Sequence, residues 1–370
     1  MRVHVVDPPA YTPPYDNSLC AALTRTGADV ELITSEFLHG RAPDLLGFPV
    51  DEHFYRASAK RGSGARGRKP QKAIEHVAGM YRLRTRTAAA DIVHYQWLDL
   101  QVLDWLLLPA PRPRLLTAHG TLRGGRPGWG ARRVYHQMDA VVALSEYGAA
   151  KLREQAGVPS ERVHVIPHGP LDYVTRIPSP APLPAELNGS DGPVVLFFGI
   201  VRPYKGVDVL LDAVQQLHGT GAELWIVGRT LHVDVEELRE RARRSSIKVR
   251  FVSRFVDDRE IPPVFERADL VVLPYREVEQ SGVLYLALAF GKPIVMSAVG
   301  GFPEVAARGA GRLVPPGDVE SLAQTIGDLL ERPEERRQLA DSTRAAVAEH
   351  YSWDAIAKDH IALYRELLGE

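Results

Sequence analysis

The sequence predicts an α/β protein made of two similar halves, each built around a parallel sheet. Short β-rich runs alternate with helical patterns along the whole chain, which is typical of parallel strands joined by crossover helices. The alternation pauses once, in a proline-rich stretch over residues 170–192, and then starts again. A chain of 370 residues is long enough for two domains of roughly 150 to 200 residues each.

The β-rich runs give the order of the expected strands. Before the pause they are VHVV at 3–6, VELIT at 30–34, DIVHY at 91–95, RLLTA at 114–118, AVVAL at 140–144 and VHVIP at 163–167. After it they are VVLFFG at 194–199, ELWIVG at 223–228, VRFV at 249–252, LVVLP at 270–274 and IVMS at 294–297. Apolar residues repeat at helical spacing over 207–217, which predicts a helix with one face on the second sheet. The pause itself, with five prolines, is expected to be a linker.

Composition excludes several classes of protein. The 45 Lys and Arg residues are matched by 46 Asp and Glu, so we expect no nucleic-acid partner. The single cysteine, Cys20, excludes a disulfide framework and a cysteine-ligated zinc site. The first β-rich run is too short for the apolar core of a signal peptide, and no apolar run is long enough to span a bilayer. We therefore expect a protein that is cytoplasmic or peripheral to a membrane.

One segment is strongly basic although the chain is nearly neutral. Residues 56–72 hold seven cationic side chains, no acidic ones and three glycines. Such a composition suits a solvated loop, and it also suits contact with an anionic acceptor or an anionic membrane surface. The sequence leaves both interpretations open.

Two turns in the second half have features of a diphosphate site. The first, FFGIVRPYKG at 197–206, carries Arg202 and Lys205 between a strand and the predicted helix. The second places Gln280, Ser281 and Gly282 before a helix expected to start at about Val283, with Ser281 suited to cap it. Free N–H groups at a helix start and nearby cations both favour phosphate oxygens. No GxxxxGK[ST] loop is present and no GxGxxG follows the first strand, which disfavours kinase-like and dehydrogenase interpretations.

The chain resembles glycosyltransferase family 4 in a series of motifs. They are LTAHG at 116–120, ALSEY at 143–147, VIPHG at 165–169, FFGIVRPYKG at 197–206, ADLVVLPY at 268–275, QSGV at 280–283, AFGKPIV at 289–295, SAVGGFPEV at 297–305 and YSWDAIAKDHIALY at 351–364. The resemblance implies the GT-B architecture, in which two Rossmann-like domains with parallel sheets face each other across a cleft. It implies an acceptor-binding domain over 1–170, a linker over 171–192 and a nucleotide-sugar-binding domain over 193–349. The terminal helix, 350–370, would cross back to the first domain.

The resemblance also assigns roles to residues of this chain. Arg202 and Lys205 would bind the donor diphosphate and stabilise the leaving nucleotide, and His119 would reach the transferred sugar, unless it only caps a strand-helix turn. Backbone near 227–229 and 254–256 would contact the nucleotide base. The full set of expected donor-binding residues is Gly199, Arg202, Lys205, Gly228, Arg254, Phe255, Gln280, Ser281, Gly282 and Val283.

This sequence departs from the family pattern at two places. The family's paired glutamates map to Val278 and Leu286, so Glu279, or with less support Glu277, is expected to approach the donor sugar instead. The family's Gly-Gly turn after the first strand is replaced by a proline-rich turn, where Tyr11, Tyr15 and Asp16 are candidates for acceptor contact. Tyr95, Trp97 and Asp99 follow the third expected strand, where open α/β sheets place ligands, although Trp97 could equally be a core residue.

The expected function is a retaining transfer of a hexose-like sugar from a nucleoside diphosphate, UDP or GDP, to an acceptor hydroxyl. The nucleotide sugar is a co-substrate, and no cofactor or metal is expected because no DxD triplet occurs and cations can neutralise the diphosphate. A sugar-nucleotide 2-epimerase of the same architecture is one alternative. A family member that binds a sugar nucleotide without turnover is another, motivated by Leu286. The sequence identifies neither the base, the sugar nor the acceptor.

Overall fold

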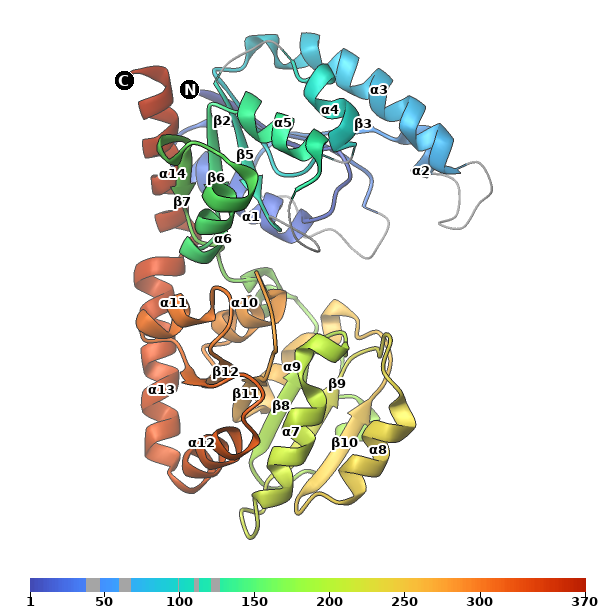
Figure 1. The fold of residues 1–370 in the computed structure, drawn as a ribbon, viewed down its shortest axis with the longest axis vertical. Coiled ribbons are helices and arrows are strands. Elements are labelled where there is room, and N and C mark those ends of the chain that lie inside the picture. The colour runs from blue at the N-terminus through green and yellow to red at the C-terminus, as the bar shows by residue number, and fades with distance from the viewer. Residues whose placement is uncertain (38–46, 60–67, 99, 110–112, 121–126) are drawn as a thin grey trace. The chain divides into compact units, whose positions relative to one another are not determined.

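A computed structural model describes the chain except for residues 38–46, 60–67, 99, 110–112 and 121–126. It divides into two compact units (Figure 1). Unit 1 comprises Met1–Gly169 and Ser352–Glu370, and unit 2 comprises Pro170–Tyr351. Each unit holds one parallel sheet, so the prediction of two α/β halves is confirmed.

The sheet of unit 1 has seven strands in the order β3-β2-β1-β4-β5-β6-β7. The strands are β1 (Arg2–Asp7), β2 (Asp29–Ser35), β3 (Val50–Phe54), β4 (Ile92–Tyr95), β5 (Arg114–Ala118), β6 (Ala140–Ala143) and β7 (Val163–Val165). The α-helices of this unit are α1 (Pro13–Arg25), α2 (Arg56–Ala59), α3 (Arg68–Arg86), α4 (Gln101–Leu107), α5 (Trp129–Gln137), α6 (Glu146–Lys151) and α14 (Trp353–Leu368). Val3 pairs with both Val30 and Ile92, which places β1 in the middle of the sheet.

Both faces of this sheet are covered, because successive strand residues point to opposite sides. Val5 packs in a cluster with Leu19 of α1 and Ile356 of α14. Its neighbour Val6 packs in a second cluster with Met80 of α3. The last helix of the chain therefore completes a core that begins with the first strand.

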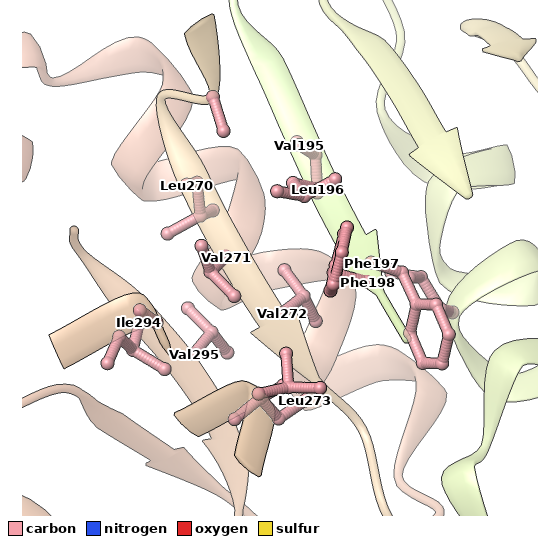
Figure 2. Close-up of a cluster of buried hydrophobic side chains, with 14 of the residues drawn as sticks. Val195, Leu196, Phe197, Phe198, Leu270, Val271, Val272, Leu273, Ile294 and Val295 are labelled. Atoms are coloured by element: carbon pink, nitrogen blue, oxygen red, sulfur yellow. The ribbon is translucent and has the colours of Figure 1, made fainter. Parts of the chain in front are cut away.

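The sheet of unit 2 has six strands in the order β10-β9-β8-β11-β12-β13. The strands are β8 (Val194–Phe198), β9 (Glu223–Val227), β10 (Lys248–Val252), β11 (Leu270–Leu273), β12 (Ile294–Ser297) and β13 (Arg312–Val314). The α-helices are α7 (Val207–Ala213), α8 (Val235–Arg243), α9 (Ile261–Arg267), α10 (Gly282–Ala289), α11 (Phe302–Ala307), α12 (Val319–Glu331) and α13 (Pro333–Ala346). Figure 2 shows the apolar side chains of β8, β11 and β12 that form the middle of its core. These strands are buried along their length, which explains their continuous apolar runs.

The structure differs from the sequence prediction in three details. Two strands were not expected, β3 and β13, and both lie at sheet edges. Residues 170–192 are not a free linker, because Val174 and Leu187 are fully buried in the core of unit 2. The helix expected over 207–217 is α-helical only to Ala213 and continues as a 3-10 turn over Val214–Gln216.

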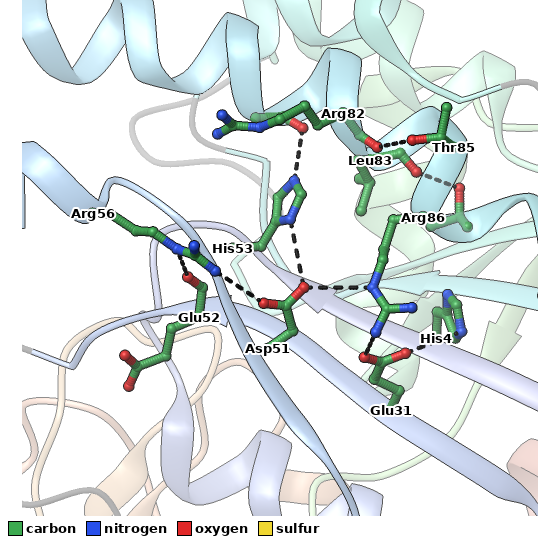
Figure 3. A network of polar contacts seen from close by, with 12 residues as sticks. His4, Glu31, Asp51, Glu52, His53, Arg56, Arg82, Leu83, Thr85 and Arg86 are labelled. Atoms are coloured by element: carbon green, nitrogen blue, oxygen red, sulfur yellow. Dashed lines mark hydrogen bonds and ion pairs between the residues drawn. The ribbon is translucent and has the colours of Figure 1, made fainter.

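Helix α3 is fixed to the sheet of unit 1 by polar contacts as well as by apolar packing (Figure 3). Arg86 at its end forms ion pairs with Glu31 of β2 and Asp51 of β3. His53 Nε2 lies 3.1 Å from the Gly79 carbonyl oxygen in the middle of the helix. These contacts hold one side of α3 against the sheet edge.

Within the described part of the chain, no helix is both long and apolar enough to cross a membrane.

Candidate functional site

In each sheet, the order in which successive strands are added reverses at one point, the topological switch. In unit 1 this switch lies between β1 and β4, and in unit 2 it lies between β8 and β11. Open α/β sheets bind ligands at the carboxyl ends of the strands that flank such a switch. Both positions are therefore candidate ligand sites.

In unit 2, the backbone segments at the switch lie unusually close together. Gly206 has φ +66°, and a Cβ there would lie 1.9 Å from the Pro274 carbonyl oxygen. Gly228 has φ +144°, and a Cβ there would lie 2.2 Å from the Gly199 carbonyl oxygen. Only glycine fits both the conformation and the space. Both glycines are therefore packed tightly against neighbouring backbone, which fixes the course of the chain at the strand ends.

Lys205 places a buried ammonium group at this switch. The residue is only 8% exposed, and its Nζ lies 5.2 Å from the centroid of the Tyr275 ring. A Cβ on Gly199 would lie 3.4 Å from Nζ and 2.9 Å from a Val283 methyl group, so Gly199, Lys205 and Val283 converge. Burial, followed by the nearby Arg202, lowers the pKa of Lys205 to about 8. A bound diphosphate would supply the counter-charge that this ammonium lacks.

Arg276 holds the turn that carries these cations, and sequence reasoning missed it. Its guanidinium donates to both carboxylate oxygens of Asp208, at 2.8 and 2.7 Å, and to the Pro203 carbonyl oxygen at 3.0 Å. Its backbone N–H also donates to the Tyr204 carbonyl oxygen. The position of Arg276 just after a predicted strand was the signal available in the sequence. Its partners Asp208 and Pro203, however, lie 68 and 73 residues earlier in the chain.

The start of α10 contributes the second predicted phosphate contact. Ser281 is the residue before the helix, but its hydroxyl makes no cap and lies 3.3 Å from the Tyr275 hydroxyl. The expectation that its side chain caps the helix is therefore wrong, and the first amides of α10 are not occupied by it. Gln280 accepts a hydrogen bond from the Tyr285 hydroxyl, which fixes its side chain.

The remaining predicted donor residues vary in exposure. Arg202 is exposed, and its guanidinium has no hydrogen bond or ion pair with the residues that the structure describes. Arg254 is engaged with Glu260 at 2.6 Å, and Phe255 beside it is 69% exposed. Leu286 is buried in the core, where a carboxylate would be costly. Glu277 is exposed and Glu279 is half-buried.

In unit 1, aromatic rings gather at the switch. Trp97 stacks on His119, with ring centroids 5.3 Å apart and an interplanar angle of 13°, and the edge of Tyr11 meets Trp97 at 5.4 Å. His119 Nε2 lies 2.9 Å from Gln96 Oε1, so this nitrogen donates. Burial, with a contribution from His168, lowers the pKa of His119 well below its usual range. Trp97 and the 53%-exposed Tyr11 offer apolar surface suited to a sugar ring.

Two carboxyl groups lie beneath these rings. Asp7 at the end of β1 accepts the N–H of Tyr11 at 2.9 Å, and Thr12 links Trp97 Nε1 to Asp16, with distances of 3.0 and 3.4 Å. Burial raises the pKa of Asp7 to about 6. Burial and the neighbouring Asp7 raise the pKa of Asp16 well above its usual range. The two carboxyl groups are therefore protonated more readily than exposed carboxyl groups.

Three of the predicted acceptor residues have buried side chains. Tyr95 is fully buried in the core, and Tyr15 and Asp16 are each only 1% exposed. Tyr15 instead supports the site from below, with its ring 4.6 Å from that of His119. Asp99 lies outside the described residues. Of the predicted acceptor residues that the structure describes, Trp97 and Tyr11 reach the surface.

Among the described residues, no group of three or more His, Cys, Asp or Glu side chains is arranged to hold a metal ion.

Comparison with known proteins agrees with this architecture. Residues 17–170 match the family described as Glycosyltransferase Family 4, and residues 192–332 match the family described as Glycosyl transferases group 1. The D-inositol 3-phosphate glycosyltransferase of Xylanimonas cellulosilytica is 28% identical over 381 residues, covering 95% of this chain and 90% of that protein. The alpha-D-kanosaminyltransferase of Streptomyces kanamyceticus is 28% identical over 248 residues, covering 65% of this chain and 63% of that protein. The chain belongs to the glycosyltransferases of the family 4 type.

A solved structure shows the same fold. Anabaena HepE has a TM-score of 0.71 at 20% identity and covers 99% of this chain and 100% of its own. The fold is therefore GT-B.

Proposed function

We propose that this glycosyltransferase moves a hexose-like sugar from a nucleoside diphosphate, UDP or GDP, to an acceptor hydroxyl, with retention of configuration and without a bound metal ion. The observation that carries the proposal is the convergence of Gly199, Lys205 and Val283 at the switch of unit 2. A buried ammonium beside the first turn of α10 is suited to a diphosphate. Lys205 and Arg202 then stabilise the charge that develops on the leaving phosphate.

The relatives support this choice of donor. HepE was solved with UDP and with UDP-glucose, and a relative from Mycolicibacterium smegmatis is named as a GDP-mannose-dependent mannosyltransferase. The nucleotide base would lie near Gly228 and the exposed ring of Phe255, which follow the adjacent strands β9 and β10. Retention follows the family resemblance, with the leaving phosphate as the base for the acceptor hydroxyl.

Unit 1 is proposed to bind the acceptor through Trp97, Tyr11 and His119. Its residues 56–72 are proposed to contact an anionic acceptor or a membrane surface, and 60–67 of these lie outside the described residues. If so, removing the cations of this segment raises the Michaelis constant for the acceptor and flattens its salt dependence.

The decisive experiment is a thermal-shift panel of nucleoside diphosphates on the full chain. A ligand present at 100 times its dissociation constant adds about 2.7 kcal/mol of stability, so the cognate base is readily identified. The Lys205→Met variant should lose the shift and Trp97→Ala should keep it. No shift with any nucleoside diphosphate would contradict the donor assignment. Sugar-nucleotide conversion without an acceptor would instead indicate an epimerase.

A further inference from the structure

Most of the large apolar side chains exposed on this protein lie on three neighbouring helices of unit 1. Among the described residues, twelve large apolar side chains are exposed, and seven of them belong to α3, α4 and α5. These seven are Ile74, Val77, Tyr81, Val102, Leu103, Leu106 and Trp129, and we call them the α3–α5 face. Scattered single exposures are normal, but such a concentration marks an interaction surface.

The α3–α5 face is continuous. Arg84 of α3 donates to the Leu106 carbonyl oxygen of α4 at 3.2 Å. A Cβ on Gly130 would lie 2.6 Å from Val102 Cα, so the start of α5 packs directly on α4. Figure 1 shows α4 beside both α3 and α5. The seven side chains are therefore exposed on helices that lie side by side.

The face points away from the core of unit 1. Ile74, Val77 and Tyr81 repeat at helical spacing on the outer side of α3, where Ile74 is 72% exposed and Tyr81 is 69% exposed. His76, Met80 and Leu83 on the opposite side of α3 are fully buried. That inner side is also held by His53 and by the ion pairs of Arg86 (Figure 3). Rotation of α3 into the core cannot bury the apolar stripe, because the inner side already fills that space.

The helices that carry this face are strongly cationic. α3, α4 and α5 hold eight Lys and Arg residues and two acidic residues, whereas the whole chain has a net charge of −1. Both acids are bonded inward. Glu75 accepts from the N–H and hydroxyl of Ser58, and Asp104 is fully buried with its Oδ1 2.5 Å from His76 Nε2. Arg86 is also paired inward, with Glu31 and Asp51. The outward charge beside the apolar residues is nevertheless positive, because five other cations of these helices are exposed: Lys69, Arg82, Arg84, Arg132 and Arg133.

The arginines also lie against aromatic rings at the edge of the face. The Arg133 guanidinium is 4.5 Å from the centroid of Trp105 and 4.4 Å from that of Trp129. Arg84 lies 5.9 Å from the Tyr81 ring. Aromatic rings with a polar end and long cationic side chains are the residues favoured at the boundary between lipid tails and headgroups.

We propose that the α3–α5 face docks on an anionic lipid bilayer, with its apolar side chains in the interfacial layer and its cations at the headgroups. Anionic headgroups match the positive charge, and a fluid apolar layer matches side chains spread over three helices. A second copy of this chain fits poorly, because a symmetric contact would bring the same cations face to face. The proposal does not depend on the proposed donor or acceptor.

The test is sedimentation of the full chain with vesicles of phosphatidylcholine alone or mixed equally with phosphatidylglycerol. Binding should be at least about tenfold stronger to the mixed vesicles and should weaken at 0.5 M salt, because exposed charges are then screened. The double variant Ile74→Gln/Leu106→Gln should reduce binding to mixed vesicles about tenfold, since it removes two exposed apolar groups without touching the core. Leu313→Gln, at an exposed position of unit 2, is the matched control and should bind like the parent.

Two results would overturn the proposal. One is equal binding of the parent and the double variant to mixed vesicles, with both folded by circular dichroism. The other is a dimer, detected by light scattering without lipid, that the double variant converts to a monomer, because the face would then belong to a second copy. The nucleoside diphosphate thermal shift should be the same in parent and double variant, which separates this test from that of the proposed function.

Discussion

The two topological switches of this protein present opposite chemistry on the same type of sheet. The switch in unit 2 is built from close backbone contacts at Gly199, Gly206 and Gly228 and carries the buried Lys205. The switch in unit 1 has a proline-rich turn, stacked aromatic rings and the buried carboxyl pair Asp7 and Asp16. An anion needs open amides and positive charge, whereas a sugar hydroxyl and its ring need apolar planes and neutral hydrogen-bonding groups. The fold supplies the position, and the local sequence selects the ligand.

The largest effect is expected from removing the cations of unit 2. Lys205→Ala or Arg202→Ala should lower turnover by about 100-fold or more, the scale for losing a charge that stabilises a developing anion. Steady-state kinetics with saturating donor would measure it. Arg239→Ala, an exposed arginine of the same unit paired only with Glu236 one helical turn away, is the control and should be near the parent rate. Near-parent turnover in both site variants would show that unit 2 does not bind a diphosphate through these cations.

The next effect tests the backbone contacts of unit 2. Gly206→Ala should destabilise the protein by about 2 kcal/mol or more, because a Cβ meets the Pro274 carbonyl oxygen in addition to the strain of positive φ. Gly219→Ala has a similar φ, +72°, but nothing within 4 Å, so about 1 kcal/mol is expected. Urea unfolding of both variants gives the difference. Equal losses would mean that the turn moves away from Pro274 freely.

The stability of unit 1 should depend on pH in a way that the stability of unit 2 does not, and this effect should be of intermediate size. The raised folded-state pKa of Asp7, about 6, and of Asp16 means that the folded state keeps a proton that the unfolded state has released. This contribution is most favourable below about pH 4 and is lost as the pH rises through 6. Asp16→Asn removes one of the two charges and should reduce that loss by about 1 to 3 kcal/mol.

Hydrogen exchange at β1 and α1 of the full chain, measured between pH 4 and pH 8, would report this loss locally. The amides of β8 and α7 in unit 2 serve as the internal reference. An unchanged pH profile in Asp16→Asn would mean that the two carboxyl groups do not share a proton.

The smallest effect concerns the replacement of the family glutamates. Glu279→Gln should lower turnover by about threefold to tenfold and Glu277→Gln by less, because Glu279 is half-buried near the start of α10 and Glu277 is exposed. The ratio of the two rates, measured side by side, is the readout. Parent rates in both variants would leave the departure at Val278 without a substitute.

The sequence predicted the fold and the cations but not the burial of the acceptor side chains. Central strands such as 194–199 are recognisable because burial on both faces makes them continuously apolar, whereas β3, with the sequence VDEHF, is an edge strand and reads as polar. Lys205 could be singled out because it lies in a glycine-containing turn between a strand and a helix, although the sequence did not show that it is buried. Tyr95 was misplaced because position at a strand end does not say which face its side chain takes or what covers that face.

In unit 2 as well, the sequence did not predict which distant segments contact each other. The role of Arg276 depends on Asp208, and that of Ser281 on Tyr275, and both pairings are made by the tertiary fold. The pKa of Lys205 likewise follows from burial by surrounding elements rather than from its neighbours in the chain.

The position of α14 affects how the protein is made. Trp353, Ile356 and Tyr364 of this helix complete the core of unit 1, whereas unit 2 is formed by one continuous segment, Pro170–Tyr351. During synthesis, unit 2 therefore has all its residues before unit 1 does, although unit 1 emerges first. The Tyr364 hydroxyl lies 2.7 Å from His94 Nδ1, and His94 is followed two residues later by Gln96, the partner of His119. The newly made chain thus acquires the polar support of its unit 1 site only when its last helix leaves the ribosome.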